Sequence, residues 1–139
     1  MIDVFAPEGL LPADRVPGLL QALAQAILRH EGAPPRSPYL ENTAAYLHAL
    51  PAAAVATAAA PRARALRVNV VTPPGALTRE AQRGLVAEIT TLLSDAAGDP
   101  ALAGSTWVIR TEAAEGGWGI AGTAFGREEF AAARAGARA

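Results

Sequence analysis

The sequence of 139 residues contains no cysteine and no lysine, since all twelve basic residues are arginine. Without cysteine there are no disulfide bonds, no thiolate catalysis and no Cys-based zinc or iron–sulfur site. The two histidines are too few to build a conventional metal cluster alone. We therefore expect no metal and no cofactor.

An excess of charge of one sign and long apolar runs are also lacking. Twelve basic residues oppose thirteen acidic ones, so no positive surface for nucleic acid or an anionic membrane is expected. No run approaches the roughly 18–20 apolar residues that span a bilayer, and the printed start has no signal-peptide pattern. We expect a cytoplasmic protein that binds neither nucleic acid nor membrane.

Apolar residues are abundant, at 51% of the sequence. Such a chain can bury enough surface to offset the entropy lost on folding. A length of 139 residues fits one compact domain.

An internal repeat organises this domain. A shift of 66 positions, without a gap, aligns identical residues along both halves: Val4 with Val70, Pro7 with Pro73, Gly9 with Gly75, Leu11 with Leu77, Gly18 with Gly84, Leu19 with Leu85, Gly32 with Gly98 and Pro34 with Pro100. A shift of 63 aligns residues 46–48 with 109–111 more weakly and adds a second extended segment to each half. Repetition of this kind indicates a duplicated structural unit.

Each half has the pattern of a β-α-β unit. Residues 2–6 and 66–72 form short β-branched runs that end at Pro/Gly turns, which predicts strands. An apolar stripe predicts the first helix, and Pro17 is tolerated in it only if the helix starts near Asp14, so that the proline lies in the first turn. Thr78 caps the second helix, and Gly98 ends it.

We therefore predict an α/β fold in which two tandem β-α-β units, residues 1–60 and 66–125, form one domain. Their strands join in one four-stranded mixed sheet with both helices on one face. Residues 126–139 add a short helix, expected at 127–134, and a frayed tail. Consecutive apolar strand residues, such as Val4-Phe5 and Val108-Ile109, predict that the uncovered face packs against other subunits.

The second half carries a family resemblance. Residues 68–80, the apolar helix, the strand 107–112 and the closing run 117–122 resemble the tautomerase superfamily. Glu112 followed by Gly117-Trp118-Gly119-Ile120-Ala121-Gly122 is the most specific part. Two fused copies resemble long members such as malonate semialdehyde decarboxylase, cis-3-chloroacrylic acid dehalogenase and the migration inhibitory factor group. The resemblance implies a homotrimer whose sheets pack around a central axis.

The chemistry implied by this resemblance uses an amino-terminal proline as a base, and here the sequence departs. Residue 2 is Ile2, and the first proline, Pro7, lies within the chain. Either Met1 is retained and its amino group acts as the base, or a proline preceded the printed start. Arginines are also missing from the turns where small tautomerases carry them, so the ligand is less acidic than usual or other residues bind it.

Candidate catalytic groups are the Met1 amino group, His48, Glu112 and Arg110. His48 shares a strand face with Tyr46 and can orient or protonate a substrate, or serve as a structural histidine. Arg110 and Glu112 share a face of the last strand, where a structural ion pair is the alternative.

Candidate pocket residues are Trp107, Trp118, Tyr46, Arg36 and Tyr39. Trp118 lines a pocket or fills a subunit interface. Arg36 and Tyr39, in the loop after the first helix, form a pocket lip or a solvated loop.

The resemblance implies a cofactor-free isomerase that moves a proton on a small enol or keto compound, or a related decarboxylase- or hydratase-like lyase. The alternative is a non-catalytic, ligand-binding member that has lost its base. A ferredoxin-like dimeric α/β barrel has a similar order of elements and remains a third option.

Overall fold

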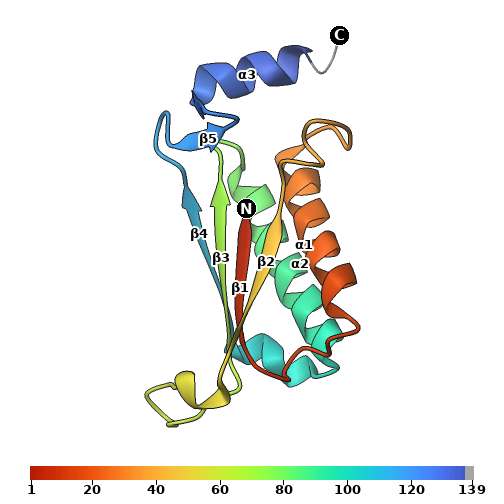
Figure 1. Cartoon of the computed structure of the whole chain (residues 1–139), viewed down its shortest axis with the longest axis vertical. Helices are drawn as coiled ribbons and strands as arrows, with labels where there is room; N and C mark the ends of the chain where they lie inside the picture. Colours follow the sequence, from red (N-terminus) through yellow and green to blue (C-terminus); the bar gives the residue numbers. More distant parts are fainter. Residues whose placement is uncertain (137–139) are drawn as a thin grey trace.

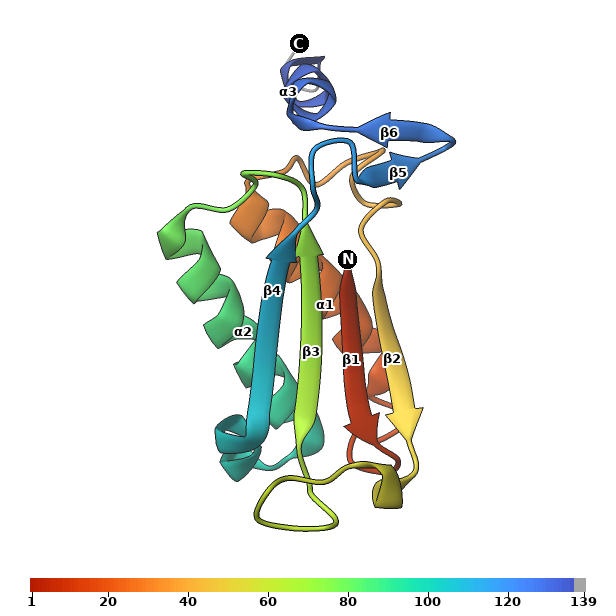
Figure 2. The same ribbon diagram turned by 90° about the vertical axis from the view of Figure 1, so that its left-hand side faces the viewer.

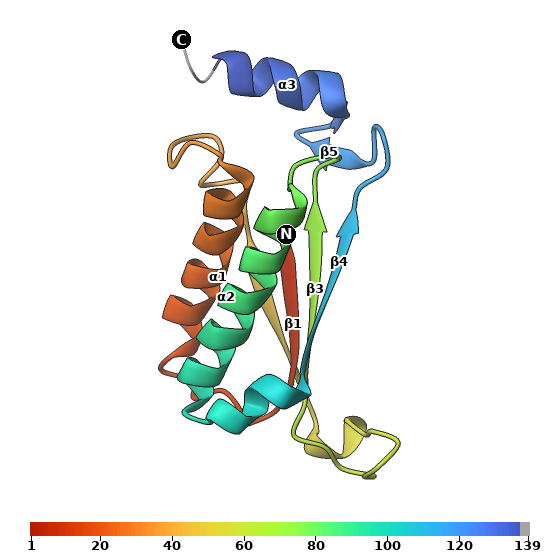
Figure 3. The ribbon, with the colours of Figure 1, turned by 180° about the vertical axis from the view of Figure 1, so that it is seen from behind.

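A computed structural model describes residues 1–136 and has two layers, a sheet and a pair of long helices on one of its faces (Figure 1). The sheet contains β1 (Ile2–Pro7), β2 (Ala45–Leu50), β3 (Leu66–Thr72) and β4 (Thr106–Glu112). Helices α1 (Val16–Glu31) and α2 (Arg79–Ala97) lie side by side over it (Figure 3). Short 3-10 helices occupy Ala52–Ala54 and Pro100–Ser105.

The chain continues beyond the sheet as a hairpin and a third helix. Strands β5 (Trp118–Ile120) and β6 (Thr123–Phe125) pair antiparallel, and α3 (Arg127–Gly136) follows them. All three lie beyond the end of the sheet at which β1 begins (Figure 2). The predicted helix after residue 126 is therefore present, and residues 137–139 of the predicted tail lie outside the described residues.

The sheet has the predicted mixed topology, in the order β2-β1-β3-β4. Within each half the two strands are parallel, and β1 and β3 join the halves as an antiparallel pair. Ile2 lies opposite Ala45, and Val68 lies opposite Val108. These two pairs are related by shifts of 66 and 63 positions, so both shifts found in the sequence preserve the same strand register.

The same turn leaves the first strand of each half. The Leu10 amide donates to the Pro7 carbonyl at 3.1 Å, and the Ala76 amide donates to the Pro73 carbonyl at 3.2 Å. Gly9 and Gly75 occupy the third position of these turns with φ of 77° and 66°. Only glycine adopts this left-handed conformation without strain, which explains its presence in both turns.

The helices begin differently. Thr78 caps α2 as predicted, because its side chain accepts a hydrogen bond from the Ala81 amide at 3.2 Å. The expected start of α1 near Asp14 is two residues too early, since a turn closed by the Arg15 amide and the Pro12 carbonyl precedes Val16. Pro17 still lies in the first helical turn, where its missing N–H leaves no bond unmade.

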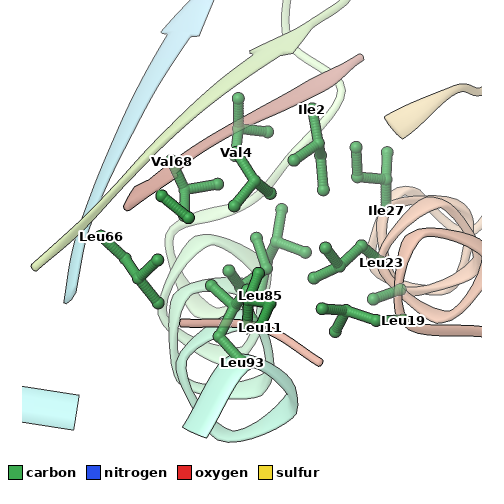
Figure 4. Packing of buried hydrophobic residues seen from close by; sticks show 14 of the residues in the cluster. Ile2, Val4, Leu11, Leu19, Leu23, Ile27, Leu66, Val68, Leu85 and Leu93 are labelled. Atoms are coloured by element: carbon green, nitrogen blue, oxygen red, sulfur yellow. The ribbon is translucent and has the colours of Figure 1, made fainter. Parts of the chain in front are cut away.

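One apolar core lies between the sheet and the two helices (Figure 4). Ile2, Val4, Val68, Leu23 and Ile89 are fully buried in it. Since strand side chains alternate between faces, each of the apolar pairs noted in the sequence has one member on the opposite face.

That opposite face is covered by none of the helices within residues 1–136 (Figure 1). Tyr46, Trp107 and Ile109 are about half exposed there. The ring of Phe5 stacks on His48 with centroids 4.4 Å apart, and the Arg67 guanidinium lies 4.4 Å from the Phe5 centroid. None of the described helices is long and apolar enough to cross a membrane.

Candidate functional site

The amino group of Met1 is fixed at the end of the strand ladder. It donates a hydrogen bond to the Val71 carbonyl at 2.9 Å, and the Met1 carbonyl accepts one from the Val71 amide at 3.0 Å. These two bonds extend the antiparallel pairing of β1 and β3 by one residue. The position of the amine is therefore set by the sheet rather than by a free chain end.

A cavity of about 170 Å³ is lined in part by Met1, the residue that carries this amine. Its walls come from the end of α1, the loop that follows, the turn after β3, the hairpin and α3, elements that gather at one end of the sheet (Figure 2). The walls are mainly apolar: Met1, Ile27, Leu28, Glu31, Ala33, Pro38, Tyr39, Asn42, Thr43, Pro73, Trp118, Ile120, Phe125, Phe130 and Ala133.

Three aromatic rings join the hairpin to α3. Trp118 meets Phe130 edge to face with centroids 6.1 Å apart, and Phe125 lies 5.5 Å from Phe130. Such geometries are favourable for aromatic pairs beyond the area that they bury. The rings therefore stabilise the part of the chain that covers the Met1 amine.

A second, more open hollow of about 560 Å³ adjoins the cavity. Both are lined by Met1, Asn42, Trp118 and Ile120, and the second also includes Tyr46. Met1, the residue that carries the amine, is therefore shared by the two hollows.

Burial lowers the pKa of the Met1 amino group below its ordinary value of 8.0. Desolvation disfavours the ammonium form, and the negative charges of Glu31 and Asp3 oppose this effect more weakly. A larger share of the amine is then neutral near pH 7. A neutral amine has a lone pair and can accept a proton.

The structure brings several of the candidates together at this place. Met1, Tyr39 and Trp118 line the cavity, and Tyr46 lines the adjoining hollow. The hydroxyl of Tyr39 is buried and has no hydrogen-bond partner within the described part of the chain. A buried hydroxyl without a partner is unfavourable, and a ligand oxygen can relieve that cost.

Other candidates lie elsewhere. His48, on β2, faces the open side of the sheet. It pairs with Phe5 of β1, and Phe5 lies four residues after Met1. Its Nε2 lies 2.7 Å from the Asp3 carboxylate. Trp107, at the far end of β4, lines a separate hollow of about 260 Å³. Arg36 is exposed in its loop and lines neither hollow at Met1.

Arg110 and Glu112 contact the turn after β3. Arg110 Nη1 donates to Thr72 Oγ1 and to Glu112 Oε1, both at 3.3 Å, and Glu112 Oε2 accepts from the Gly75 amide at 3.1 Å. This backbone hydrogen bond, followed by Arg110, lowers the pKa of Glu112. The geometry is that of an ion pair which holds the turn carrying Pro73, a cavity residue.

The sequence reasoning missed Phe125 and Phe130, and it did not place Asn42 or Glu31 at a site. A compositional signal was available, since the chain has three phenylalanines and two of them lie within residues 125–130. Among residues 1–136, no three His, Cys, Asp or Glu side chains come together as a metal site requires.

Comparison with known proteins gives a match to a family model and matches to solved structures. The family model described as tautomerase enzyme matches residues 67–128. Over the whole chain, the structure resembles Q0, a fused 4-OT in a wild-type symmetric trimer, with a TM-score of 0.77 and 25% identity over 96% of this chain and 98% of that one. No curated protein sequence matches significantly.

Two further structures have the same fold at lower identity. Pt0534, in a crystal structure of the protein inactivated by 2-oxo-3-pentynoate, gives a TM-score of 0.75 and 24% identity over 91% of this chain and 96% of that chain. N1, a member of the cis-3-chloroacrylic acid dehalogenase family, gives a TM-score of 0.76 and 20% identity over 95% of this chain and 90% of that chain.

Proposed function

We propose that this chain, a member of the tautomerase superfamily by its fold and by the sequence of residues 67–128, is a cofactor-independent isomerase. The substrate is a small enol or keto compound, and the Met1 amino group is the base. The observation that carries the proposal is the position of this amine, hydrogen-bonded to Val71 at the junction of an apolar cavity and an open hollow.

The reaction needs one group that accepts and returns a proton. The neutral amine takes a proton from a carbon next to the substrate carbonyl, or from the enol oxygen, and the resulting ammonium returns it at the other position. The Val71 carbonyl accepts a hydrogen bond from the amine in both forms. Glu31 and Asp3 favour the transient ammonium, because both raise the pKa of the group.

Deuterium exchange tests this proposal. Phenylpyruvate and phenylacetone are incubated with the protein in D2O, and loss of their benzylic protons is followed by NMR. Exchange above the buffer rate on at least one ketone is expected. The rate should rise with pH through a pKa below 8.0, because the free amine is the active form.

Acylation gives the decisive control. The chain has no lysine, so the α-amine is its one aliphatic amine, and acetylation followed by hydroxylamine leaves that group blocked. Exchange should disappear while circular dichroism stays unchanged. Exchange that survives acetylation overturns the role of Met1, and the intact mass of the chain from its native host identifies the group that precedes Ile2.

A binding protein without catalysis is the second candidate, because residue 2 is Ile2 and not the proline that the family uses as its base. Binding of phenylacetone without exchange at any pH supports it.

We also propose that the chain assembles as a homotrimer through the open face of the sheet. Tyr46, Trp107 and Ile109 expose large apolar side chains there, and the structurally similar Q0 is a symmetric trimer. Sedimentation equilibrium should give an assembly with three times the chain mass, and Trp107→Glu should lower the mass of that assembly.

A further inference from the structure

We propose that the site at Met1 takes an uncharged, ring-bearing carbonyl or enol compound in preference to one that carries a carboxylate. This inference rests on the proposed function for its reaction, but the selectivity itself follows from the charge, size and lining of the two hollows.

The charges around the amine are negative. Among the described residues that line the cavity and the adjoining hollow, the side chains with a formal charge are Glu31 and Glu41. The described lining residues include no arginine and no histidine, and the chain has no lysine. A ligand carboxylate placed there loses water, finds no cationic side chain among the described lining residues and meets the like charges of Glu31 and Glu41.

Two arginines at this end of the sheet have other partners. Arg110 donates to Thr72 and Glu112, and the Arg127 guanidinium lies 3.7 Å from the Glu115 carboxylate. Moving either side chain to a ligand breaks these contacts. Neither guanidinium therefore lines the two hollows as a fork of donors of the kind that binds carboxylates in pairs of hydrogen bonds, and Arg36, exposed in the loop after α1, lines neither hollow.

The size of the cavity fits a single ring. Apolar cavities of about 150 Å³ are known to hold benzene, and the cavity at Met1 measures about 170 Å³. Trp118, Phe125 and Phe130 offer aromatic surface to such a ring. A carbonyl attached to the ring then extends toward the amine at the junction with the open hollow.

Tyr39 and Asn42 are uncharged polar residues of the cavity lining. The Tyr39 hydroxyl has no partner among the described residues, and the Asn42 amide, which donates from Nδ2 to the Pro38 carbonyl at 2.8 Å, has a second N–H for a ligand oxygen. Neutral donors satisfy a carbonyl or enol oxygen without requiring a countercharge. The neutral donors and the negative charges of the lining thus both favour an uncharged ligand.

A matched pair of amine-directed reagents tests the selectivity. 4-Phenyl-3-butyn-2-one and 2-oxo-4-phenyl-3-butynoate differ by a methyl group in place of a carboxylate. With either one, the Met1 nitrogen adds to the alkyne carbon β to the carbonyl, an N–H proton moves to the α-carbon, and no atom leaves. The intact mass therefore rises by the whole reagent mass, and peptide mapping locates it.

Each labelling rate is divided by the rate for the free dipeptide Met-Ile, which removes the intrinsic reactivity of the reagent. We expect this ratio to be about tenfold or more higher for the ketone than for the keto acid, because the form of the amine that reacts is neutral and the described lining offers an anion beside it no cationic side chain. The protein is used in its natural assembly, so a cation from a neighbouring copy would appear as a preference for the acid.

Two variants with the same loss of charge sharpen the result. Glu31→Gln removes a negative charge beside the cavity. It also lowers the pKa of the amine and so speeds labelling by both reagents, but it should raise the keto-acid ratio more than the ketone ratio. Glu8→Gln removes one in the turn after β1, away from both hollows, and should leave it unchanged.

The outcomes separate the two proposals. An equal or higher ratio for the keto acid, or no labelling above the dipeptide rate, overturns the inferred selectivity whatever the exchange assay gives. Preferential labelling by the ketone without deuterium exchange supports the selectivity and overturns the proposed isomerase.

Discussion

Met1 and Arg67 occupy equivalent places in the two halves of the chain, 66 positions apart, yet their surroundings differ. Met1 lies beneath the hairpin and α3, beside a cavity with aromatic walls. Arg67 lies on the open face over the Phe5 ring and lines a hollow with Trp107 and part of the connection between the halves. One half therefore begins with a buried amine and the other with a guanidinium.

The difference arises from the segments that follow each half. Because β1 and β3 are antiparallel, the segment after β4 covers the start of β1, and the segment after β2 lies near the start of β3. The first of these segments is a hairpin and a helix, while the second is a loop with one short 3-10 turn. The repeat builds the scaffold, and the chain beyond each repeat decides what kind of site forms at its end.

Where the halves are alike, they should respond alike to substitution. Leu23 and Ile89 are equivalent by the shift of 66, and both are fully buried. We expect Leu23→Ala and Ile89→Ala each to lower the free energy of unfolding by about 2–5 kcal/mol, through lost burial and the cavity left behind. Urea unfolding at one fixed protein concentration measures both. A twofold or larger disparity would show that the two helices do not share one core equally.

The equivalent glycines Gly18 and Gly84 should respond differently. A Cβ on Gly84 would lie 2.7 Å from His30 Cε1, whereas nothing lies within 4 Å of a Cβ on Gly18. The His30 ring is held by Glu88 at 2.9 Å, which limits its retreat.

We expect Gly84→Ala to destabilise by about 1–3 kcal/mol through overpacking, and Gly18→Ala to stabilise by up to about 1 kcal/mol through helix propensity. The urea midpoints of the two variants measure these changes, and His30→Ala should restore the stability that Gly84→Ala loses. If both glycine variants shift in the same direction, the contact with His30 has no energetic weight.

Glu112 should give the smallest effect, and it has no counterpart in the first half, where Ala49 occupies the equivalent position. Its pKa is lowered from 4.5 by the Gly75 amide, so the folded state favours the carboxylate. The contribution to stability is present above about pH 4.5 and is lost as the pH falls through the lower folded pKa.

Glu112→Gln should therefore reduce stability slightly at pH 7 and not at pH 3. Urea midpoints across this range test it, with Glu128→Gln, an exposed carboxylate in α3, as the control. A deficit that persists at pH 3 would point to lost packing instead of lost charge.

The repeat made most of the fold predictable. Identities such as Gly9 with Gly75 mark turns that require a left-handed residue, and strand patterns mark segments with two buried or half-buried faces. These signals are local, so one sequence suffices to detect them. The start of α1 was misplaced because a turn closed through backbone atoms at Pro12 leaves no side-chain signature.

The site was less predictable because its walls meet only through the tertiary structure. Trp118 and Tyr39 were singled out as aromatic residues in loops, but nothing local links either to Met1, over a hundred residues from Trp118. Phe130 lies on a helix whose packing against the hairpin depends on ring contacts across several residues. Arg110 and Glu112 drew attention as chemistry-bearing residues, although their contacts support a turn.

The hydrogen bonds between Met1 and Val71 have a practical consequence for anyone who prepares this protein. An affinity tag fused in front of Met1 would turn its amine into a peptide nitrogen and lead the added residues into the space under Trp118. Tagged protein of this kind would form the same sheet but would give no signal in assays that depend on the free amine. A carboxy-terminal tag, or one removed by a protease that leaves Met1 first, avoids this artefact.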